Sequence, residues 1–579
     1  MPNFIPDNKL LRYFLYVIFL VNFFFFEIKE FLKSFYKFLS VFKYISLKNF
    51  VYYKLGLSFE FKNIDFNSYI KNNKKIWTSK INLKNDEKII VTGFVHLPGD
   101  QIPNCIIGKY LELYHNIRLY GFLDKGDIFG ELIFKSFGIK DILTLDKKNF
   151  FTRFSNFLHA LLVVDKIKHI DDLINFKFKN INVGKSTYDH FLRFTNNATT
   201  EKVSFKIILF LSQCLYIIND LHRKFKNSKI KAIVETETQF IPSSLIFQFF
   251  LEKNVPIFSR ENGPNDCSIR KYSSANETYT PRYEISKKLF KHILEIGNNK
   301  ASEKGFEILE KRFQGKDRQI FYGRDKFKQI ELKEYDKEKI SNLNNWDIKK
   351  PIVCVFGHCL VDNNFELGWR LYRDNLTWLR ETLKIISKID DVNWLIKPHP
   401  LEKTYEKIIT NTEKEILNYD NSNIKLCPED ISPKSLTKIC LAGITSTGSV
   451  AIEFTGFGLP VVTAGKTPFS ELEIIDVPKS KQEYENLLKN INSIPKPSLK
   501  KIEMSKAYTY ILSKLILTRL PLIPKFDINS KLDFSFFKNA EKLLERYDSK
   551  NDKFKDYFFY QLDNNERHTI NHELLKKLN

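Results

Sequence analysis

Apolar runs and amphipathic stretches alternate along the chain from Glu87 onward. In the first half, short apolar runs predict strands and longer stretches with helical periodicity predict helices: strands at residues 88–94, 117–123, 231–235 and 255–258, and helices at residues 102–114, 205–225 and 241–251. Strands that alternate with helices are typical of a parallel sheet with helices on its faces. The first half therefore predicts an α/β domain.

The alternation stops in a charged, helical stretch between Tyr272 and Asp347 and then resumes. Strands are expected at residues 351–357, 392–396, 424–427, 439–444 and 460–464, and helices at residues 375–389 and 449–457. Because 579 residues exceed what one core usually supports, we expect two cores with appended helices. The expected regions are residues 1–80 (hydrophobic, basic and helical), 81–342 (first α/β domain), 343–500 (second α/β domain) and 501–579 (polar helical extension).

The amino-terminal region combines apolar and basic residues. The apolar run from Tyr13 to Phe26 is about 14 residues long, shorter than the roughly 18 to 20 residues that span a bilayer, and no small-residue cleavage site follows it. Residues 31–53 mix aromatic side chains with lysines, as expected for a helix that lies in a membrane interface. We expect peripheral attachment to the inner face of the cytoplasmic membrane. The alternative is that these aromatic side chains pack on the protein's own surface.

Composition narrows the class of partner. The formal net charge of +23 favours anionic partners such as nucleotides, phosphorylated lipids or membrane surfaces. The sequence has no zinc-finger spacing, no RNA-recognition signature and no concentrated arginine run, so nucleic acid is not expected as a partner. The seven cysteines form no CxxC pair, which argues against a disulfide framework or a structural zinc site and favours a reducing, cytoplasmic compartment.

The most informative stretch runs from Ile444 to Gly465, ITSTGSVAIEFTGFGLPVVTAG. A strand ends, a turn of small and hydroxyl residues follows and a helix begins; the turn consists of Thr445, Ser446, Thr447, Gly448 and Ser449. Free amides and hydroxyls at a helix N-terminus favour an anion, above all a phosphate. Glu453 lies one turn into the helix, where a carboxylate can accept hydrogen bonds from ribose hydroxyls. The alternative is an ordinary Ser/Thr N-cap without a ligand.

A second group of polar residues follows a strand within Trp394 to Pro400, WLIKPHP. This strand delivers Lys397 and His399 at its carboxyl end, and the flanking prolines hold the exit extended. Ligands of open α/β sheets bind outside the carboxyl ends of the strands, so a cation and an imidazole are expected where a phosphate binds. His399 could donate a hydrogen bond to that phosphate or to a leaving group. A structural histidine is the alternative.

Carboxylates follow three further strands. The first strand of the second half leads to His358 and then to Asp362, a candidate base or nucleophile, although the Asp-Asn-Asn sequence also suits an ordinary turn. Glu235 and Glu261 follow two strands of the first half and would be acceptor-side groups if two domains face each other, with helix caps as the alternative. The segment Gly184-Lys185-Ser186 resembles a fragment of a phosphate-binding loop but lacks the preceding glycine.

WLIKPHP, followed by STGSVAIEFTGFGLPVVTAG, resembles the carboxy-terminal domain of the capsule polysaccharide biosynthesis family, which includes bacterial β-Kdo transferases. The segments FGHCLVDNNF and NLTWLRETLKII are similar to a less specific family pattern, in which an Asp loop precedes a Trp-bearing helix. The resemblance covers residues 351–470. It implies the glycosyltransferase-B architecture, in which two Rossmann-like domains face each other across a cleft, with residues 81–342 on the acceptor side and 343–500 on the donor side.

The resemblance also implies which residues bind the donor. His399 and residues 446–449 would hold its phosphate, with Glu453 near the nucleotide sugar, and the donor would be a CMP-activated acid such as Kdo, bound without a metal ion or other cofactor. The expected activity is transfer of a sugar to a lipid-linked or glycan acceptor in capsule or surface polysaccharide synthesis. Two alternatives stay open: a CDP-polyol phosphotransferase of the teichoic-acid type, and a non-catalytic polysaccharide export or assembly protein.

Overall fold

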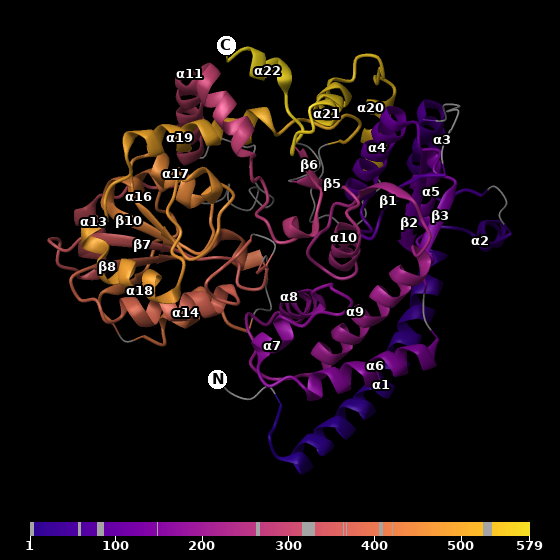
Figure 1. Ribbon diagram of the computed structural model, residues 1–579, viewed down its shortest axis with the longest axis horizontal. Helices are drawn as coiled ribbons and strands as arrows, with labels where there is room; N and C mark the ends of the chain where they lie inside the picture. Colours follow the sequence, from indigo (N-terminus) through magenta and orange to yellow (C-terminus); the bar gives the residue numbers. More distant parts are fainter. Residues whose placement is uncertain are drawn as a thin grey trace.

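The computed structural model of the protein has two α/β lobes that lie side by side (Figure 1). It describes residues 5–55, 59–77, 86–146, 149–261, 267–314, 331–362, 364–365, 368–404, 409–419, 421–524 and 535–578. Each lobe is built on its own, mainly parallel sheet. The fold class expected from the sequence, two Rossmann-like α/β domains with a helical amino-terminal region, is therefore confirmed.

The first sheet has six strands in the order β3-β2-β1-β4-β5-β6. The strands are β1 (Lys88–Thr92), β2 (Arg118–Asp124), β3 (Asp141–Leu145), β4 (Ile230–Val234), β5 (Ile257–Glu261) and β6 (Ser268–Tyr272). All neighbours pair in parallel except β5 and β6, which are antiparallel. The central strand β1 is almost wholly buried, because helices cover both faces of a parallel sheet. The sequence predicts neither β3 nor β6.

The second sheet has five parallel strands in the order β11-β10-β7-β8-β9. The strands are β7 (Ile352–Phe356), β8 (Asn393–Lys397), β9 (Ile424–Leu426), β10 (Cys440–Thr445) and β11 (Val461–Thr463). Successive side chains of a strand point to opposite faces. Val353 and Val355 therefore join one core with Trp394, whereas Cys354 joins the other core with Leu395. β7, β9 and β11 fall within the expected runs, and β8 and β10 each extend one residue beyond them, to Lys397 and Thr445.

Helices cover both faces of each sheet (Figure 1). The first lobe contains α3 (Ile64–Trp77), α4 (Pro98–His115), α5 (Ile128–Ser136), α6 (Phe150–Asp165), α7 (Ile170–Ile174), α8 (Val183–Thr195), α9 (Phe205–Lys224), α10 (Ser243–Glu252) and the 3-10 turn η1 (Ala275–Glu277). The second lobe contains α13 (Lys337–Asn344), α14 (Asn375–Ile386), α15 (Thr412–Ile416), α16 (Pro433–Ile439), α17 (Val450–Gly456) and α18 (Lys481–Lys489).

Helix α11 (Lys287–Phe313) lies upstream of the expected domain boundary at residue 343, yet it packs in the second lobe. Its partners are α17 and α19 (Leu499–Tyr510), and Ile293 of α11 shares a buried cluster with Ala507 of α19. The polypeptide therefore passes from the first lobe to the second before α11, although the first strand of the second sheet, β7, comes later in the sequence.

The last segment returns from the second lobe to the first (Figure 1). After a π-helical turn at Ile511–Leu515, α20 (Ser535–Leu544) packs on α3 and α21 (Lys553–Asp563) packs on α4, and α22 (His572–Lys576) follows. Phe537 of α20 and Phe558 of α21 are fully buried in the core of the first lobe. The expected helical extension is thus an integral part of both lobes.

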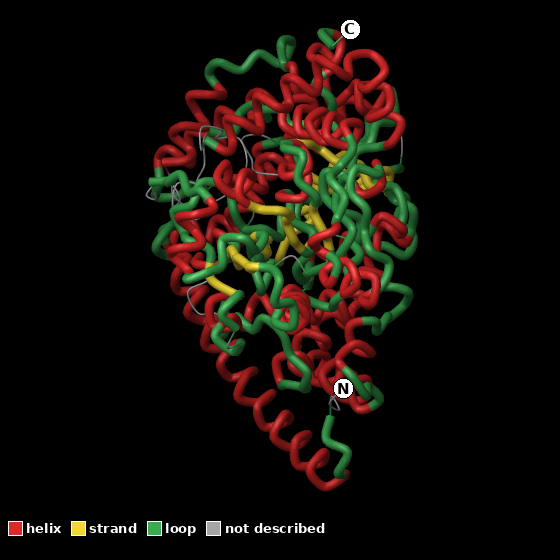
Figure 2. Tube along the Cα trace, turned by 90° about the vertical axis from the view of Figure 1, so that its left-hand side faces the viewer, coloured by secondary structure: helices red, strands yellow, loops and turns green. Residues whose placement is uncertain are grey.

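The amino-terminal helix α1 (Lys9–Val41) is longer than the apolar run predicts (Figure 2). Its 33 residues correspond to a length of about 50 Å, so the expectation that this segment is too short to span a bilayer is wrong. Among the described residues, α1 and α9 are long and apolar enough to cross a membrane, but α9 is mostly buried inside the first lobe. A second short helix, α2 (Leu47–Lys54), follows α1.

One side of α1 is fixed to α6. Phe23 is buried, with its ring centroid 4.6 Å from that of Phe157, and the Arg153 guanidinium of α6 donates hydrogen bonds of 2.9 Å to the Glu27 carboxylate. The opposite side is exposed, including Phe25 at 66% and Phe31 at 72%. Some of the aromatic side chains therefore pack on the protein's own surface, and more of them face outward.

Candidate functional site

Three strands of the second sheet end at the same edge and bring the expected site loops together. β10, β7 and β8 are neighbours in that order, and their carboxyl ends point the same way because both pairings are parallel. Beyond β7, the Gly357 amide donates a 2.8 Å hydrogen bond to the Lys397 carbonyl. A Cβ on Gly357 would lie 3.4 Å from the His399 backbone nitrogen, so the two strand exits are in close contact.

His358 joins the basic loop to the hydroxyl turn. Its Nε2 accepts a 3.2 Å hydrogen bond from the Thr447 amide and lies 3.3 Å from the Thr445 hydroxyl. On its other side the ring stacks against His399, with centroids 6.4 Å apart and an interplanar angle of 12°. Burial, followed by the nearby charges of Arg370 and His399, holds the pKa of His358 well below its ordinary value. The ring is therefore neutral, with an unprotonated Nε2.

The hydroxyl turn has hydrogen-bond donors that no described residue accepts. Ser449 makes no side-chain cap, and the Thr445 hydroxyl accepts a 3.2 Å hydrogen bond from the Gly448 amide instead. The amides of Ser449 and Val450 donate no hydrogen bond to the described residues, and the buried Thr447 hydroxyl has no partner among them. An ordinary Ser/Thr N-cap would satisfy these groups with its own side chain. The turn therefore has the properties of an anion site.

Arg370 brings a cation to the same turn, and the sequence does not single it out. Backbone hydrogen bonds between the segment around it and the end of β11 hold it in place: Leu371 N to Ala464 O at 2.9 Å, and Lys466 N to Trp369 O at 2.7 Å. A Cβ on Gly465 would lie 2.9 Å from Thr447 Cγ2 and 3.0 Å from Arg370 Cγ. Burial lowers the pKa of Arg370 to about 10, so the guanidinium stays charged at neutral pH.

His399 lies near enough to Asp362 for the charge of that carboxylate to act on the imidazole. Burial lowers the pKa of His399 to about 4, and the negative charge of Asp362 opposes this shift. The imidazole is therefore neutral at pH 7 and can donate one hydrogen bond and accept another. In this form the ring can donate a hydrogen bond to a phosphate. It can also take up a proton when the negative charge of the phosphate lies beside it.

Two expected site residues point elsewhere. Lys397 follows Leu395 by two residues in β8 and so projects to the face of the sheet that carries Cys354 and Cys427, where its charge acts on both thiols. Glu453 forms a 2.7 Å ion pair with Arg312 of α11. The structure does not bring either side chain to the group around His358.

Glu235 and Glu261, the expected acceptor-side groups, have different surroundings. Glu235 is buried beyond β4, where burial raises the pKa of its carboxyl to about 8 and one oxygen accepts a 3.2 Å hydrogen bond from the Glu237 amide. Its other oxygen is buried without a hydrogen-bond partner among the described residues. A carboxyl of this kind carries a proton at neutral pH.

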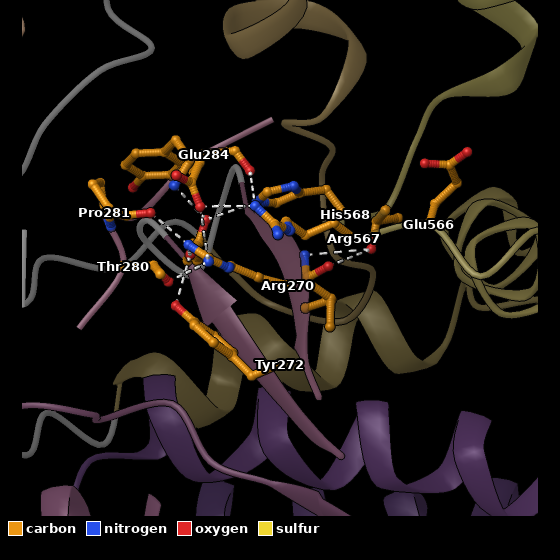
Figure 3. A network of polar contacts seen from close by, with 12 residues as sticks. Arg270, Tyr272, Thr280, Pro281, Glu284, Glu566, Arg567 and His568 are labelled. Atoms are coloured by element: carbon orange, nitrogen blue, oxygen red, sulfur yellow. Dashed lines mark hydrogen bonds and ion pairs between the residues drawn. The ribbon is translucent and has the colours of Figure 1, made fainter. Parts of the chain in front are cut away.

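Glu261 belongs to a buried network that ties the lobes together. It accepts hydrogen bonds from the Tyr283 amide at 3.0 Å and from His568 at 3.2 Å. The imidazole of His568 and the guanidinium of Arg270 overcome burial and lower the pKa of Glu261 to about 2. Figure 3 shows Arg270 reaching the carbonyl of Pro281 in the segment that links the two lobes. In the structure, the Glu261 carboxylate thus balances the charge of Arg270 where the chain passes from one lobe to the other.

The lobes also meet directly beside the His358 group. Asp374, the N-cap of α14, accepts a 2.6 Å hydrogen bond from the Tyr188 hydroxyl of α8 and a 2.7 Å hydrogen bond from the Thr199 hydroxyl. The Asn364 amide donates a 3.3 Å hydrogen bond to Asp189 of α8. Helix α8 therefore faces the candidate site from across the lobe interface. In the described part of the chain, no group of three or more His, Cys, Asp or Glu residues has the arrangement of a metal site.

No protein-family model and no curated protein matches this chain. Among solved structures, the β-Kdo 2,7 transferase KpsC of Thermosulfurimonas dismutans is similar at 13% sequence identity and a TM-score of 0.30, over 64% of this chain and 97% of that one. The UDP-GlcNAc 2-epimerase of Neisseria meningitidis, bound to UDP-GlcNAc, is similar at 10% identity and a TM-score of 0.23, over 74% of this chain and 97% of that one.

A third similar structure is HepE of Anabaena in complex with UDP and glucose, at 11% identity and a TM-score of 0.22, over 80% of this chain and all of that one (100%). At these identities and TM-scores, the similar structures assign neither a family nor an activity to this chain.

Proposed function

We propose that the protein is a glycosyltransferase of surface-polysaccharide synthesis that binds the phosphate of a nucleotide-activated sugar at the edge of the second sheet. One observation carries this proposal: the Thr447 hydroxyl is buried without a partner among the described residues. The Thr447 amide donates to His358, and the side chains of Thr447 and Arg370 meet at Gly465. Hydroxyl and amide donors next to a cation match the acceptor oxygens and the charge of a phosphate.

The same groups support transfer without a metal ion. When a sugar leaves its donor, negative charge builds up on the phosphate, and fixed donors aimed at that charge stabilise the transition state. Arg370, His399 and the amides of residues 449 and 450 would do this here. The acceptor hydroxyl bonds to the anomeric carbon as the carbon–phosphate oxygen bond breaks, and its proton passes to a carboxylate, for which Asp362 is our candidate.

Nucleotide binding to the full chain tests the proposal. We expect CMP, CDP or UDP to bind, and Thr447→Val to weaken binding by about 10- to 100-fold, because a hydrogen bond to a charged group contributes roughly 1.5 to 3 kcal/mol. Thr463→Val is the matched control, since the Thr463 hydroxyl is also buried without a partner among the described residues but lies within β11. Equal affinities for the two variants in isothermal titration calorimetry would contradict the proposed site.

The choice of donor separates the remaining alternatives. CMP-sugars are favoured by the sequence resemblance, whereas preferential binding of CDP-polyols would indicate a polyol phosphotransferase. A ligand at about 100 times its dissociation constant stabilises a protein by roughly 2.7 kcal/mol, which a thermal-shift assay detects. If no CMP, CDP or UDP compound raises the melting temperature, the non-catalytic export or assembly alternative is favoured.

We also propose that the outward face of α1 and α2 lies on the anionic inner surface of the cytoplasmic membrane. Large apolar side chains on this face, such as Phe14, Phe25 and Phe31, are more than half exposed. Exposed lysines such as Lys33 and Lys54 lie on the same helices, and apolar area combined with positive charge is the pattern that anionic lipids attract. The contacts of α1 with α6 favour a helix that lies on the surface over one that leaves the protein to span the bilayer.

Vesicle flotation tests this attachment. The protein should float with vesicles that contain phosphatidylglycerol and much less with pure phosphatidylcholine, and the double variant Phe25→Glu/Phe31→Glu should remain in solution. Leu417→Glu is the control, because Leu417 is 83% exposed on the second lobe. Loss of a dimer in the double variant, with flotation unchanged, would show that a second copy covers this face instead.

A further inference from the structure

A small pocket lies between the lobes, next to the His358 group but separate from it. Its walls come from α8, from the loop after β4, from the region of η1 and, on the side of the second lobe, from Phe365. Asn364, the neighbour of Phe365, donates a hydrogen bond to the Asp189 carboxylate of α8. Its side-chain oxygen accepts a 3.0 Å hydrogen bond from the Asn375 backbone amide. The pocket is therefore formed by both lobes, on the acceptor side of the proposed donor site.

Lys185 of α8 brings a positive charge into this pocket without a carboxylate to balance it. Its ammonium lies 4.1 Å from the ring centroid of Tyr279 and 5.6 Å from that of Phe365, and no ion pair joins it to a described carboxylate. Burial and the nearby charge of a second lysine, Lys177, lower the pKa of Lys185. Lys185 therefore lines the pocket, and Lys177 is exposed beside it.

The pocket also contains a hydroxyl that no described group accepts. Tyr279 lines it, and the Tyr279 hydroxyl is buried without a hydrogen-bond partner in the described part of the chain. A buried donor of this kind costs free energy unless a ligand or water accepts its hydrogen bond. Together, the hydroxyl and the ammonium provide donors that lack an acceptor.

The carboxylate in the pocket, Asp189, is engaged elsewhere. It accepts a 2.9 Å hydrogen bond from the Gln239 side chain and one from Asn364, and its charge acts on Arg370 across the lobe interface. Neither Asp189 nor another described carboxylate offsets the charge of Lys185, whose pKa is affected by burial and by Lys177. An uncompensated, partly buried cation beside an unpaired donor favours an anionic ligand.

We infer that this pocket binds an anionic group of the acceptor, a carboxylate or a phosphate, through Lys185 and Tyr279. This inference rests on the proposed glycosyltransferase function and adds to it a class of acceptor: a glycan or glycolipid that carries negative charge close to the hydroxyl that is glycosylated. Tyr279 holds the ammonium over its ring and donates its own hydroxyl to the same anion. The exposed Lys177 attracts the charged group toward the pocket.

Binding of small charged probes to the full chain tests the inference. With the donor site saturated by the nucleotide that binds best, glucuronate and glycerol 3-phosphate are titrated and compared with the neutral glucose and glycerol. We expect each charged probe to bind at least tenfold more tightly than its neutral partner. Lys185→Gln should remove that preference, and Tyr279→Phe, which removes only the hydroxyl, should reduce it severalfold.

Lys339→Gln is the matched control, because Lys339 also lies over a tyrosine ring, 4.2 Å from the centroid of Tyr335, but on α13, away from the pocket. It should leave the preference unchanged. Tighter binding of glycerol 3-phosphate indicates a phosphate of a lipid-linked acceptor, and tighter binding of glucuronate indicates an acidic sugar. Either result supports the inference.

The inference is overturned if the charge preference persists in Lys185→Gln or if the unmodified protein shows no preference. Loss of nucleotide binding in Lys185→Gln would also overturn it, since Lys185 would then belong to the donor site. Failure of every nucleotide to bind the unmodified protein would instead count against the proposed function, so the two failures are distinguishable.

Discussion

Proton uptake by His399 provides the most direct test of phosphate binding at the strand edge. In the free protein, burial lowers the pKa of His399 to about 4, below the ordinary value of 6.5. A bound phosphate next to the ring would favour the imidazolium and raise this pKa again. The complex would then hold more protons than the free protein between pH 4 and 6.5, so the affinity should rise as the pH falls through this window.

The size of the effect follows from the two pKa values. If phosphate restores the pKa of His399 to about 6.5, the dissociation constant at pH 5.5 falls about tenfold relative to pH 8, which corresponds to roughly 1.4 kcal/mol. At pH 8 the imidazole is neutral in both states and contributes no change. His358 should add nothing, because its Nε2 already accepts the Thr447 amide.

Isothermal titration calorimetry with CDP at pH 5.5, 6.5 and 8.0 measures this directly, and two buffers of different ionisation enthalpy count the protons taken up. The titration of the nucleotide's own phosphate is common to all variants, so the ratio between the unmodified protein and His399→Gln isolates the histidine. His292→Gln, a change at an exposed histidine of α11, should behave as the unmodified protein does. The reasoning is refuted if His399→Gln retains the same pH dependence.

Two further predictions concern stability. The pKa of Glu235 is raised to about 8 by burial, so the folded carboxyl keeps its proton while the unfolded one loses it near 4.5, and stability falls as the pH rises between these values. Urea unfolding should therefore find Glu235→Gln more stable than the unmodified protein at pH 9, by up to about 5 kcal/mol, with no difference at pH 4. Arg312→Met leaves the largely buried Glu453 carboxylate unpaired and should cost roughly 3 to 5 kcal/mol, most of which Arg312→Met/Glu453→Gln should recover. Equal unfolding midpoints for the single and double variants would show that the pair contributes little.

The sequence predicts the interior of both sheets well because buried parallel strands are almost wholly apolar. It does not predict β6, whose sequence SIRKY reads as polar. Arg270 of β6 can be buried because Glu261 and Glu284 lie against it, and both carboxylates lie outside β6 in the sequence. Charge pairs that form between distant segments leave no periodic pattern in a single sequence.

The sequence predicts those parts of the candidate site that follow directly from strand ends, and it does not predict the parts that depend on contacts between separate segments. The hydroxyl turn and His399 stand out because strand ends at one sheet edge must converge. Arg370 does not stand out, since backbone pairing with the end of β11 places it, and nothing in its local sequence indicates that pairing. The direction of Lys397 follows from strand alternation, but only once the residue is known to lie inside β8 and not after it.

The lobe that is synthesised first is completed last. Phe537 packs its ring 4.7 Å from that of Phe66 in α3, and Phe558 lies 5.6 Å from Phe258 in β5, so residues near the end of the chain close the core of the first lobe. By the time these residues leave the ribosome, every strand of the second lobe has been available for pairing. Nascent chains that stop before residue 535 would expose the apolar side of α3, and chaperone binding is the expected fate of such chains.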